Sequence, residues 1–202
     1  MIAIIDYGMG NLRSVQKALE KAGADALITQ NRDDIEKASH VVLPGVGAMQ
    51  PAMEKLESLG LTESIKKCIK EKKPFLGICL GFQLLFEKSN EGGHVKGLGL
   101  LPGNVKRFAN DLKVPHMGWN QLDIQQKDCP LWKGIENKSN VYFCHSYYVK
   151  PDDVALISTI TDYGMDFTSA ISKNNIFGVQ FHPEKSQEIG LAILKNFMEI
   201  AP

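Results

Sequence analysis

The stretch Lys73-Pro74-Phe75-Leu76-Gly77-Ile78-Cys79-Leu80-Gly81-Phe82-Gln83-Leu84-Leu85-Phe86-Glu87 decides the fold that the sequence predicts. Its apolar run over residues 75–78 stops at Cys79, and glycines stand two residues before and two residues after this cysteine. Beyond the cysteine, leucines at positions 80, 84 and 85 recur at helical spacing. The pattern predicts a strand, a sharp turn at Cys79 and a helix.

A cysteine held on such a turn is a candidate nucleophile. The turn strains the backbone of Cys79 and pushes its thiol out of the sheet edge, while Gly77 and Gly81 let strand and helix approach without side-chain clashes. Unpaired N–H groups at the start of the helix favour the thiolate, which is the reactive form. The alternative is an ordinary buried cysteine that packs as a small hydrophobe. Packing alone does not explain the two glycines, because each weakens the element in which it lies.

Size and charge limit the broad class of the protein. With 202 residues, of which 44% are hydrophobic, the chain can bury one substantial core, and we expect a single domain over residues 1–202. Lys plus Arg and Asp plus Glu both total 23, so the formal net charge is zero. Apart from a local patch that a neutral sum could hide, this balance gives no attraction to nucleic acid or to an anionic membrane. We expect neither as a partner.

The cysteines and histidines argue against disulfides and metals. The four cysteines form no C-x-x-C pair, and a chain of this length does not need disulfide bonds. The five histidines show no H-x-x-x-H spacing, so we expect no structural metal, and nothing in the sequence calls for a cofactor. The apolar run that begins at Ile2 is too short for a signal sequence and follows no basic residue. The expected location is cytoplasmic.

Strands and helices alternate through the first half of the chain. Short apolar runs predict strands at Ile2–Ile5, Ala26–Thr29, His40–Leu43 and Phe75–Ile78, with helical segments between them. We predict an α/β fold with a mostly parallel central sheet, helices on both faces, and a smaller antiparallel β portion in the C-terminal half. There, glycine and proline break the chain into shorter predicted strands. A last helix is predicted to begin near Ser186, whose side chain suits the N-cap position. These shorter strands are predicted at residues 104–108, 114–119, 141–144, 154–161, 169–172 and 176–181.

A second group of reactive residues is His182-Pro183-Glu184. Pro183 biases His182 toward an extended backbone, in which residues two apart point to the same side. Glu184 could then fix the tautomer of the His182 ring and leave its other nitrogen free to take a proton from a thiol. A surface turn without function remains the alternative for this segment on its own. Together with the turn at Cys79, it indicates a Cys-His-Glu triad.

A third segment, Leu43-Pro44-Gly45-Val46-Gly47, follows the third predicted strand. Peptides flanked by glycine can turn their N–H groups toward the ends of the strands, where a tetrahedral intermediate needs donors for its oxyanion. An ordinary Pro-Gly turn is the simpler interpretation of this segment alone.

These segments together resemble those of the triad, or class-I, glutamine amidotransferases, which release ammonia from glutamine through a Cys-His-Glu triad and have a flavodoxin-like fold. The turn around Cys79 with Gln83 and the downstream His182-Pro183-Glu184 carry this resemblance. Four segments, which run from the first strand to the last helix, are similar to the glutaminase subunits of imidazole glycerol phosphate synthases. They are Asp6-Tyr7-Gly8-Met9-Gly10-Asn11, Pro44-Gly45-Val46-Gly47, Pro115-His116-Met117-Gly118-Trp119-Asn120 and His182-Pro183-Glu184-Lys185-Ser186.

The resemblance implies roles for individual residues. Cys79 would attack the glutamine carboxamide, His182 would act as base and then as acid, and Glu184 would orient His182. The N–H groups of Val46 and Leu80 would form the oxyanion hole. The residues implied to bind glutamine are Gly45, Gly47, Gln83, Glu91, Ser146 and Tyr147, and those implied at a partner interface are Asn11, Trp119 and Lys185. For Glu91, a solvated charge in the loop at residues 89–93 is an equal alternative.

The resemblance also implies a partner. A separate (βα)8-barrel cyclase subunit would form a heterodimer with this chain and use the ammonia in histidine biosynthesis. Related glutaminases commonly carry Pro-Gly-Gly where this chain has Pro44-Gly45-Val46. A β-branched residue restricts the backbone, so the oxyanion peptide could rest in an unproductive orientation until the partner binds. Two alternatives stay open at this point. The chain could be a different Cys-hydrolase or a glutaminase that serves another synthase, or it could be a non-catalytic scaffold with the same fold.

Overall fold

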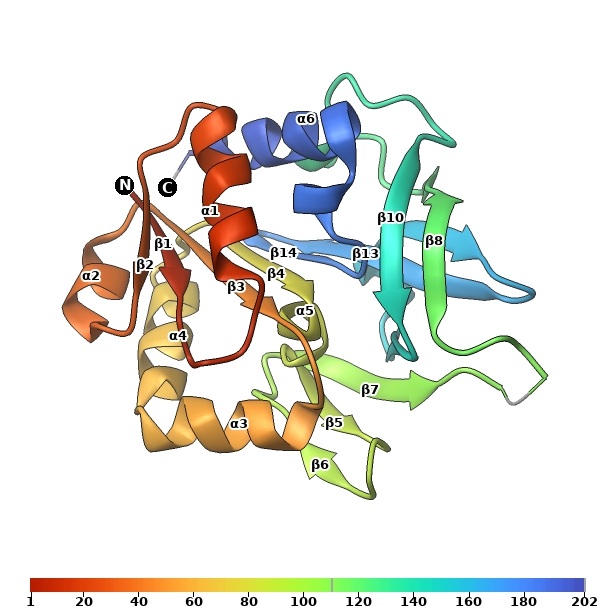
Figure 1. The fold of residues 1–202 in the computed structure, drawn as a ribbon, viewed down its shortest axis with the longest axis horizontal. Coiled ribbons are helices and arrows are strands. Elements are labelled where there is room, and N and C mark those ends of the chain that lie inside the picture. The colour runs from red at the N-terminus through yellow and green to blue at the C-terminus, as the bar shows by residue number, and fades with distance from the viewer. Residues whose placement is uncertain (110, 202) are drawn as a thin grey trace.

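A parallel sheet forms the centre of the molecule (Figure 1). The structure, a computed structural model, describes residues 1–109 and 111–201. The strands of the parallel sheet lie in the order β2-β1-β3-β4-β14, and every neighbouring pair in this series is parallel. Their bounds are β1 Ile2–Ile5, β2 Ala26–Thr29, β3 His40–Gly45, β4 Phe75–Cys79 and β14 Ile176–Val179. The continuous apolar runs of β1, β3 and β4 are buried along their whole length, as central parallel strands require.

Helices cover both faces of this sheet (Figure 1). Helices α1 (Leu12–Lys21) and α6 (Gln187–Met198) lie on one face, and α3 (Met49–Ser58) and α4 (Leu61–Lys70) lie on the other. Successive side chains of a strand point to opposite faces, so each strand contributes to two cores. Along β1, the isoleucines at positions 2 and 4 pack with α1 and α6, whereas residues 3 and 5 pack with α3 and α4.

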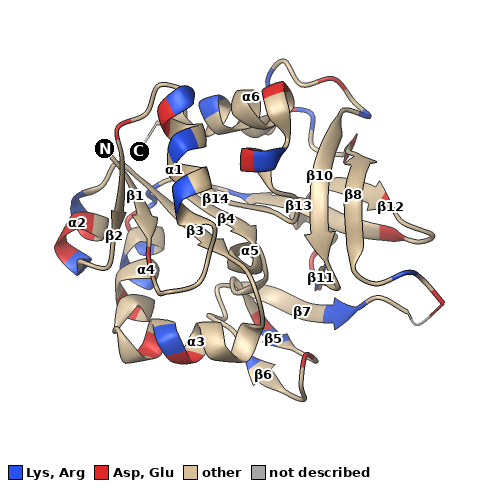
Figure 2. Ribbon diagram, viewed as in Figure 1, with Lys and Arg blue, Asp and Glu red and all other residues tan. Residues whose placement is uncertain are grey.

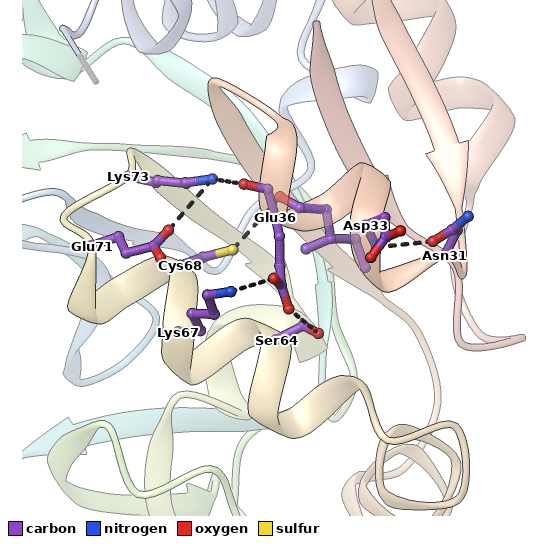
Figure 3. A network of polar contacts seen from close by, with 9 residues as sticks. Asn31, Asp33, Glu36, Ser64, Lys67, Cys68, Glu71 and Lys73 are labelled. Atoms are coloured by element: carbon purple, nitrogen blue, oxygen red, sulfur yellow. Dashed lines mark hydrogen bonds and ion pairs between the residues drawn. The ribbon is translucent and has the colours of Figure 1, made fainter.

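A polar network joins α2 (Arg32–Lys37) to α4 at the edge of the molecule (Figure 3). The Glu36 carboxylate accepts hydrogen bonds from Lys67 and from the hydroxyl of Ser64, and its backbone carbonyl accepts one from Lys73. The Asn31 side chain caps α2 by accepting the N–H of residue 33 at 2.8 Å. Lys73 stands just before β4 begins at Phe75, at the opposite end of that strand from its carboxyl terminus at Cys79, so we assign the contacts of Glu36 a structural role.

The sheet continues past β14 with mostly antiparallel neighbours, in the order β13-β11-β7-β5-β6. A separate antiparallel pair, β8 (His116–Gln121) with β10 (Asn140–His145), stands beside it (Figure 1). This arrangement confirms the predicted α/β class, with its antiparallel portion in the C-terminal half. The remaining elements are β5 Phe86–Ser89, β6 Val95–Lys96, β7 Leu101–Arg107, β9 Asp123–Ile124, β11 Tyr147–Pro151, β12 Ile157–Asp162, β13 Asp166–Lys173, and the short 3-10 turns Pro130–Trp132, Val154–Leu156 and Pro183–Lys185.

Three local predictions need correction. The helix after Cys79, α5, is a single turn over Leu80–Gln83, and Leu84 and Leu85 lie beyond it because the chain turns into β5. The strand predicted over residues 154–161 begins only at Ile157, because residues 154–156 form a 3-10 turn. Ser186 does stand at the N-cap position of α6, but its hydroxyl bonds elsewhere and does not cap the helix.

In the described part of the chain, no helix has the length and apolarity needed to cross a membrane.

Candidate active site

Cys79 occupies a strained turn between β4 and α5. Its backbone has φ 54° and ψ −109°, a conformation that a residue with a side chain adopts only at a cost of about 1–3 kcal/mol. The following turn packs tightly on β3, since a β-carbon built on Gly81 would lie 1.7 Å from the carbonyl oxygen of Leu43. A glycine is therefore required at position 81, as the sequence predicts. The thiol sits at the carboxyl end of the parallel sheet.

His182 reaches the same edge because β14 lies beside β4 in parallel. The register pairs Val179 with Ile78, so the chain leaves β14 next to the point where β4 ends at Cys79. The backbone of His182 is held on both sides: its N–H donates to the carbonyl of Tyr142 at 2.9 Å, and its carbonyl accepts the Ser186 hydroxyl at 2.7 Å. The sheet and β10 thus fix where the imidazole stands.

Glu184 binds the His182 ring from behind. Its Oε1 lies 2.8 Å from Nδ1 of His182, and the two side chains are only 1% and 5% exposed. Because the carboxylate accepts from Nδ1–H, the Nε2 atom is left for the sulfur. Burial by itself would lower the pKa of His182, but its hydrogen bonds to Cys79 and Glu184 and their negative charges raise that pKa to about 10. The imidazole can therefore hold a proton next to a thiolate.

Two further groups contact the sulfur of Cys79. The amide Nε2 of Gln180 lies 3.7 Å from Sγ and can donate to it, and the carbonyl oxygen of Cys144 lies 3.9 Å away on the side of β10. Gln180 is fully buried. Its Oε1 accepts a hydrogen bond from Gln83 at 3.0 Å, which fixes the orientation of its amide. Gln180 is thus oriented to stabilise negative charge on the sulfur.

The predicted oxyanion donors flank the sulfur. Leu80 is the first residue of α5, so its N–H has no acceptor within the helix. Gly45 pairs with Cys79 across β3 and β4, and Val46 follows it at the mouth of the site with 42% of its surface exposed. Tyr7 lies beneath this peptide: its hydroxyl would be 2.4 Å from a β-carbon on Gly45. Position 45 therefore also requires glycine.

A cavity of about 310 Å³ opens in front of the sulfur. Most of the residues predicted for the site line it, and the structure brings them together from five separate segments of the chain. Of the predicted residues, Gly45, Glu184, Asn11 and Trp119 do not line it. The lining consists of Val46, Gly47, Cys79, Leu80, Gln83, Glu91, Pro115, Cys144, His145, Ser146, Tyr147, His182 and Lys185.

Two polar side chains in the lining have definite partners. Both hydrogens of the Gln83 amide donate within the protein, to the carbonyl of Tyr147 and to Gln180, each at 3.0 Å. Only its oxygen remains for a ligand, which suits a ligand ammonium group. Glu91 accepts the backbone N–H of Met49 at 2.8 Å, at the start of α3, so it is anchored and is not a freely solvated charge.

The residues predicted at a partner interface lie around the mouth of the site. Lys185 is exposed, with Nζ 5.7 Å above the ring of Tyr142. The Trp119 ring also packs against Tyr142, at a centroid distance of 6.0 Å, and is 48% exposed. Asn11 precedes α1 at the carboxyl end of the same sheet. Figure 2 shows no charged residue on β8 and β10, whereas the outer helices carry charges of both signs. The part of the rim that β8 and β10 form is thus uncharged, whereas Lys185 and Glu91 bring charges to the cavity lining.

The sequence analysis missed several residues of the site. Gln180 falls within the strand predicted over residues 176–181, and a polar residue inside that apolar run is the signal that could have identified it. His145 and Cys144 come from β10, whose position beside the cavity depends on long-range packing. The Tyr7 hydroxyl is fully buried with no hydrogen-bond partner in the described structure. Burial, and to a smaller degree the charge of Cys79, raises its pKa well above the usual value.

Comparisons with known proteins agree with this geometry. The model of the family "Glutamine amidotransferase class-I" matches residues 3–201. The imidazole glycerol phosphate synthase subunit HisH of Syntrophotalea carbinolica is 51% identical over 204 residues, with 98% of each chain covered. The subunit of the same name from Caldanaerobacter subterraneus subsp. tengcongensis is 53% identical over 200 residues, covering 99% of this chain and 98% of the relative.

Solved structures show the same fold at low sequence identity. A glutamine amidotransferase structure superposes with a TM-score of 0.76 at 17% identity, covering 98% of this chain and all of the other. The structure of PurLQS from Thermotoga maritima gives a TM-score of 0.73 at 20% identity, covering 98% of this chain and 95% of the matched one. The chain therefore belongs to the class-I glutamine amidotransferases and, within them, to the family of the HisH subunits of imidazole glycerol phosphate synthase.

Proposed function

We propose that this chain is the glutaminase subunit of an imidazole glycerol phosphate synthase, and that Cys79, His182 and Glu184 hydrolyse glutamine to glutamate and ammonia. The observation that carries the proposal is the assembled triad. The strained Cys79 meets a buried His182, whose Nδ1 is 2.8 Å from the buried Glu184 carboxylate. Membership of the HisH family supports the choice of glutamine as substrate. Residues 1–202 would act as one glutamine amidotransferase domain.

The first half of the reaction forms a thioester. The Cys79 thiolate attacks the carboxamide carbon of glutamine while the proton of the thiol resides on His182. The negative charge that develops on the carboxamide oxygen is stabilised by the N–H of Leu80 and by the peptide of Val46. His182 then gives its proton to the leaving nitrogen, the C–N bond breaks, and ammonia departs from a γ-glutamyl thioester.

The second half regenerates the enzyme. His182, now neutral, takes a proton from a water molecule, and the resulting hydroxide attacks the thioester carbon. The C–S bond breaks and glutamate leaves, so Cys79 is again a thiolate beside the protonated His182. Glu184 keeps Nε2 of His182 aimed at the sulfur through both steps, because its bond to Nδ1 fixes the tautomer.

Four residues of the cavity wall would hold the amino and carboxylate groups of glutamine. Gln83 offers an acceptor oxygen, and the Glu91 carboxylate offers a second acceptor to the substrate ammonium. Ser146 and Tyr147 also line the cavity, where their backbone and hydroxyl groups can meet the carboxylate. Gly47, beside the oxyanion peptide, lets the substrate approach the backbone.

We further propose that a (βα)8-barrel cyclase subunit docks on the mouth of the cavity and receives the ammonia. Val46 and Lys185 line this mouth, and Met117 and Trp119 are exposed on β8. Exposed apolar side chains of this kind suit an interface. The two chains would form a heterodimer in the cytoplasm, a location that four unpaired cysteines support.

Replacement of the nucleophile tests this function. Cys79→Ala should abolish glutamine hydrolysis in the presence of the cyclase subunit, while the protein stays folded and still binds that subunit in the same preparation. Turnover of glutamine at the wild-type rate by this variant would exclude the triad.

A further inference from the structure

Two buried histidines outside the triad form a chain of hydrogen bonds that ends in the cavity wall. Nδ1 of His145 lies 2.7 Å from the carbonyl oxygen of Tyr147, so Nδ1 must carry the hydrogen. In a neutral ring Nε2 is then an acceptor, and Nδ1 of His116 lies 3.0 Å from it. His116 therefore donates to His145, and His145 donates to the Tyr147 carbonyl.

The other end of the chain lies on β8. With its Nδ1 donating, a neutral His116 has an acceptor at Nε2, and the amide Nδ2 of Asn120 stands 3.3 Å away. The same amide donates to the carbonyl of Asp162 at 2.8 Å, so both of its hydrogens are used. Each hydrogen bond in this series, from Asn120 through the two histidines to the Tyr147 carbonyl, therefore has only one possible donor. Both nitrogens of each imidazole have a hydrogen-bond partner.

The surroundings keep both rings uncharged and fixed. His145 is 6% exposed and His116 is 3% exposed. Burial, as the largest cause, lowers the pKa of His145 to about 3 and that of His116 to about 4. The His116 ring is stacked between Phe143 and Tyr163, at centroid distances of 4.8 Å and 4.0 Å. Neither ring can rotate or take a second proton without losing these contacts.

The series of hydrogen bonds ends at the Tyr147 carbonyl, which also contacts residues of the active site. The Tyr147 oxygen accepts from His145 and also from Gln83, whose second hydrogen goes to Gln180, the residue that contacts the Cys79 sulfur. His145, Ser146 and Tyr147 all line the cavity. A phenylalanine would fill the volume of His116 without the cost of burying polar nitrogens, so packing alone does not explain the histidine.

We propose that His116 is a positioning residue for glutamine binding. Through His145 it fixes the Tyr147 carbonyl, and thereby the part of the cavity wall formed by Ser146 and Tyr147. The amino-acid end of the substrate binds against this wall. This inference rests on the proposed function. It assigns His116 no contact with the substrate and no proton transfer, so its loss should weaken glutamine binding and leave the reactivity of Cys79 intact.

The test compares His116→Phe with His116→Asn in complex with the cyclase subunit. Phenylalanine keeps the stacked ring and removes the donor, whereas asparagine places an amide nitrogen near the position of Nδ1 and can still donate to His145. We expect His116→Phe to raise the KM for glutamine about tenfold with kcat within about threefold of wild type, and His116→Asn to recover most of the loss.

A second readout separates positioning from general damage. Iodoacetamide alkylates a reactive thiolate and has no α-amino or carboxylate group, whereas a diazo-ketone analogue of glutamine needs the whole site. His116→Phe should slow labelling of Cys79 by the analogue about tenfold and leave alkylation by iodoacetamide unchanged. The inference would be overturned if His116→Phe had the KM of the wild type. It would also be overturned if the rise in KM came with equally large falls in kcat and in the rate of iodoacetamide labelling.

Two controls complete the experiment. If His116→Phe does not fold, as judged by thermal unfolding, His116→Leu must give the same raised KM. Absence of glutamine turnover by the wild-type complex itself would count against the proposed function, independently of any difference between the variants.

Discussion

Substitution of Gly81 by alanine should disrupt the turn that presents Cys79. A β-carbon on Gly81 would lie 1.7 Å from the Leu43 carbonyl oxygen, whereas an ordinary contact needs about 3.5 Å, so the two segments must separate by about 1.8 Å. The obstacle is backbone, and β3 cannot move alone because Leu43 pairs with Gly77 on β4. Overpacking costs about 1–3 kcal/mol, and a backbone clash belongs at the upper end of that range.

The expected consequences follow from this displacement. For a chain of this length, about 3 kcal/mol lowers the melting temperature by roughly 6–12 °C. The same displacement moves the Leu80 N–H and the Cys79 sulfur relative to β3, and a shift of about 1 Å in a reacting group can cost about 10²-fold in rate. Thermal unfolding and glutamine turnover with the cyclase subunit measure both effects.

Gly134→Ala is the matched control. Gly134 has φ +72° and open space around the position of a β-carbon, so the change should cost about 1 kcal/mol through backbone strain and leave turnover unaffected. Wild-type melting and wild-type turnover in Gly81→Ala would show that the turn does not depend on close packing against β3, and would refute the reasoning.

Three further predictions concern the triad and its control. Glu184→Gln keeps the shape of the side chain but removes the charge on His182, and should lower kcat by roughly 10²–10⁴ with little change in the KM for glutamine; steady-state kinetics in which kcat stays at the wild-type value would contradict this role. Cys79→Ala should lower the pKa of His182 from about 10, because the sulfur supplies part of the increase; an NMR titration that finds the same pKa in both proteins would show that sulfur and imidazole do not interact. If the Val46 peptide rests in an unproductive orientation, the isolated chain should bind glutamine but turn it over roughly 10²–10³ times more slowly than the complex in which the cyclase subunit holds its nucleotide ligand. Equal rates of turnover for the chain alone, for the complex, and for the complex with that ligand would exclude this form of control.

The local motifs could be predicted from the sequence because each depends on neighbouring residues. The apolar run before Cys79 and the flanking glycines predict the strand and the sharp turn, and the structure shows both. His182 and Glu184 were expected to meet because of their spacing around a proline, and their side chains are in contact.

Long-range packing explains what the sequence did not predict. Leucines 84 and 85 fit a helical period, but α5 ends after one turn because residues 86–89 pair with β7. The Ser186 hydroxyl was expected to cap α6, but it accepts the Tyr142 N–H from β10 and donates to the His182 carbonyl. Gln180 and the His116–His145 chain depend on which strands lie side by side, and no local pattern encodes that.

Covalent labelling of the wild-type complex tests the central claim most directly. After exposure to a diazo-ketone analogue of glutamine, mass spectrometry of the digested protein should find the adduct on Cys79 alone. Cys68 and Cys129 are buried away from the cavity lining, and Cys144 lines the cavity but lacks the strained turn and the His182 partner. Excess glutamine should protect Cys79. An adduct spread evenly over the four cysteines, or labelling of Cys79 that glutamine does not slow, would contradict a glutamine-specific nucleophile at this turn.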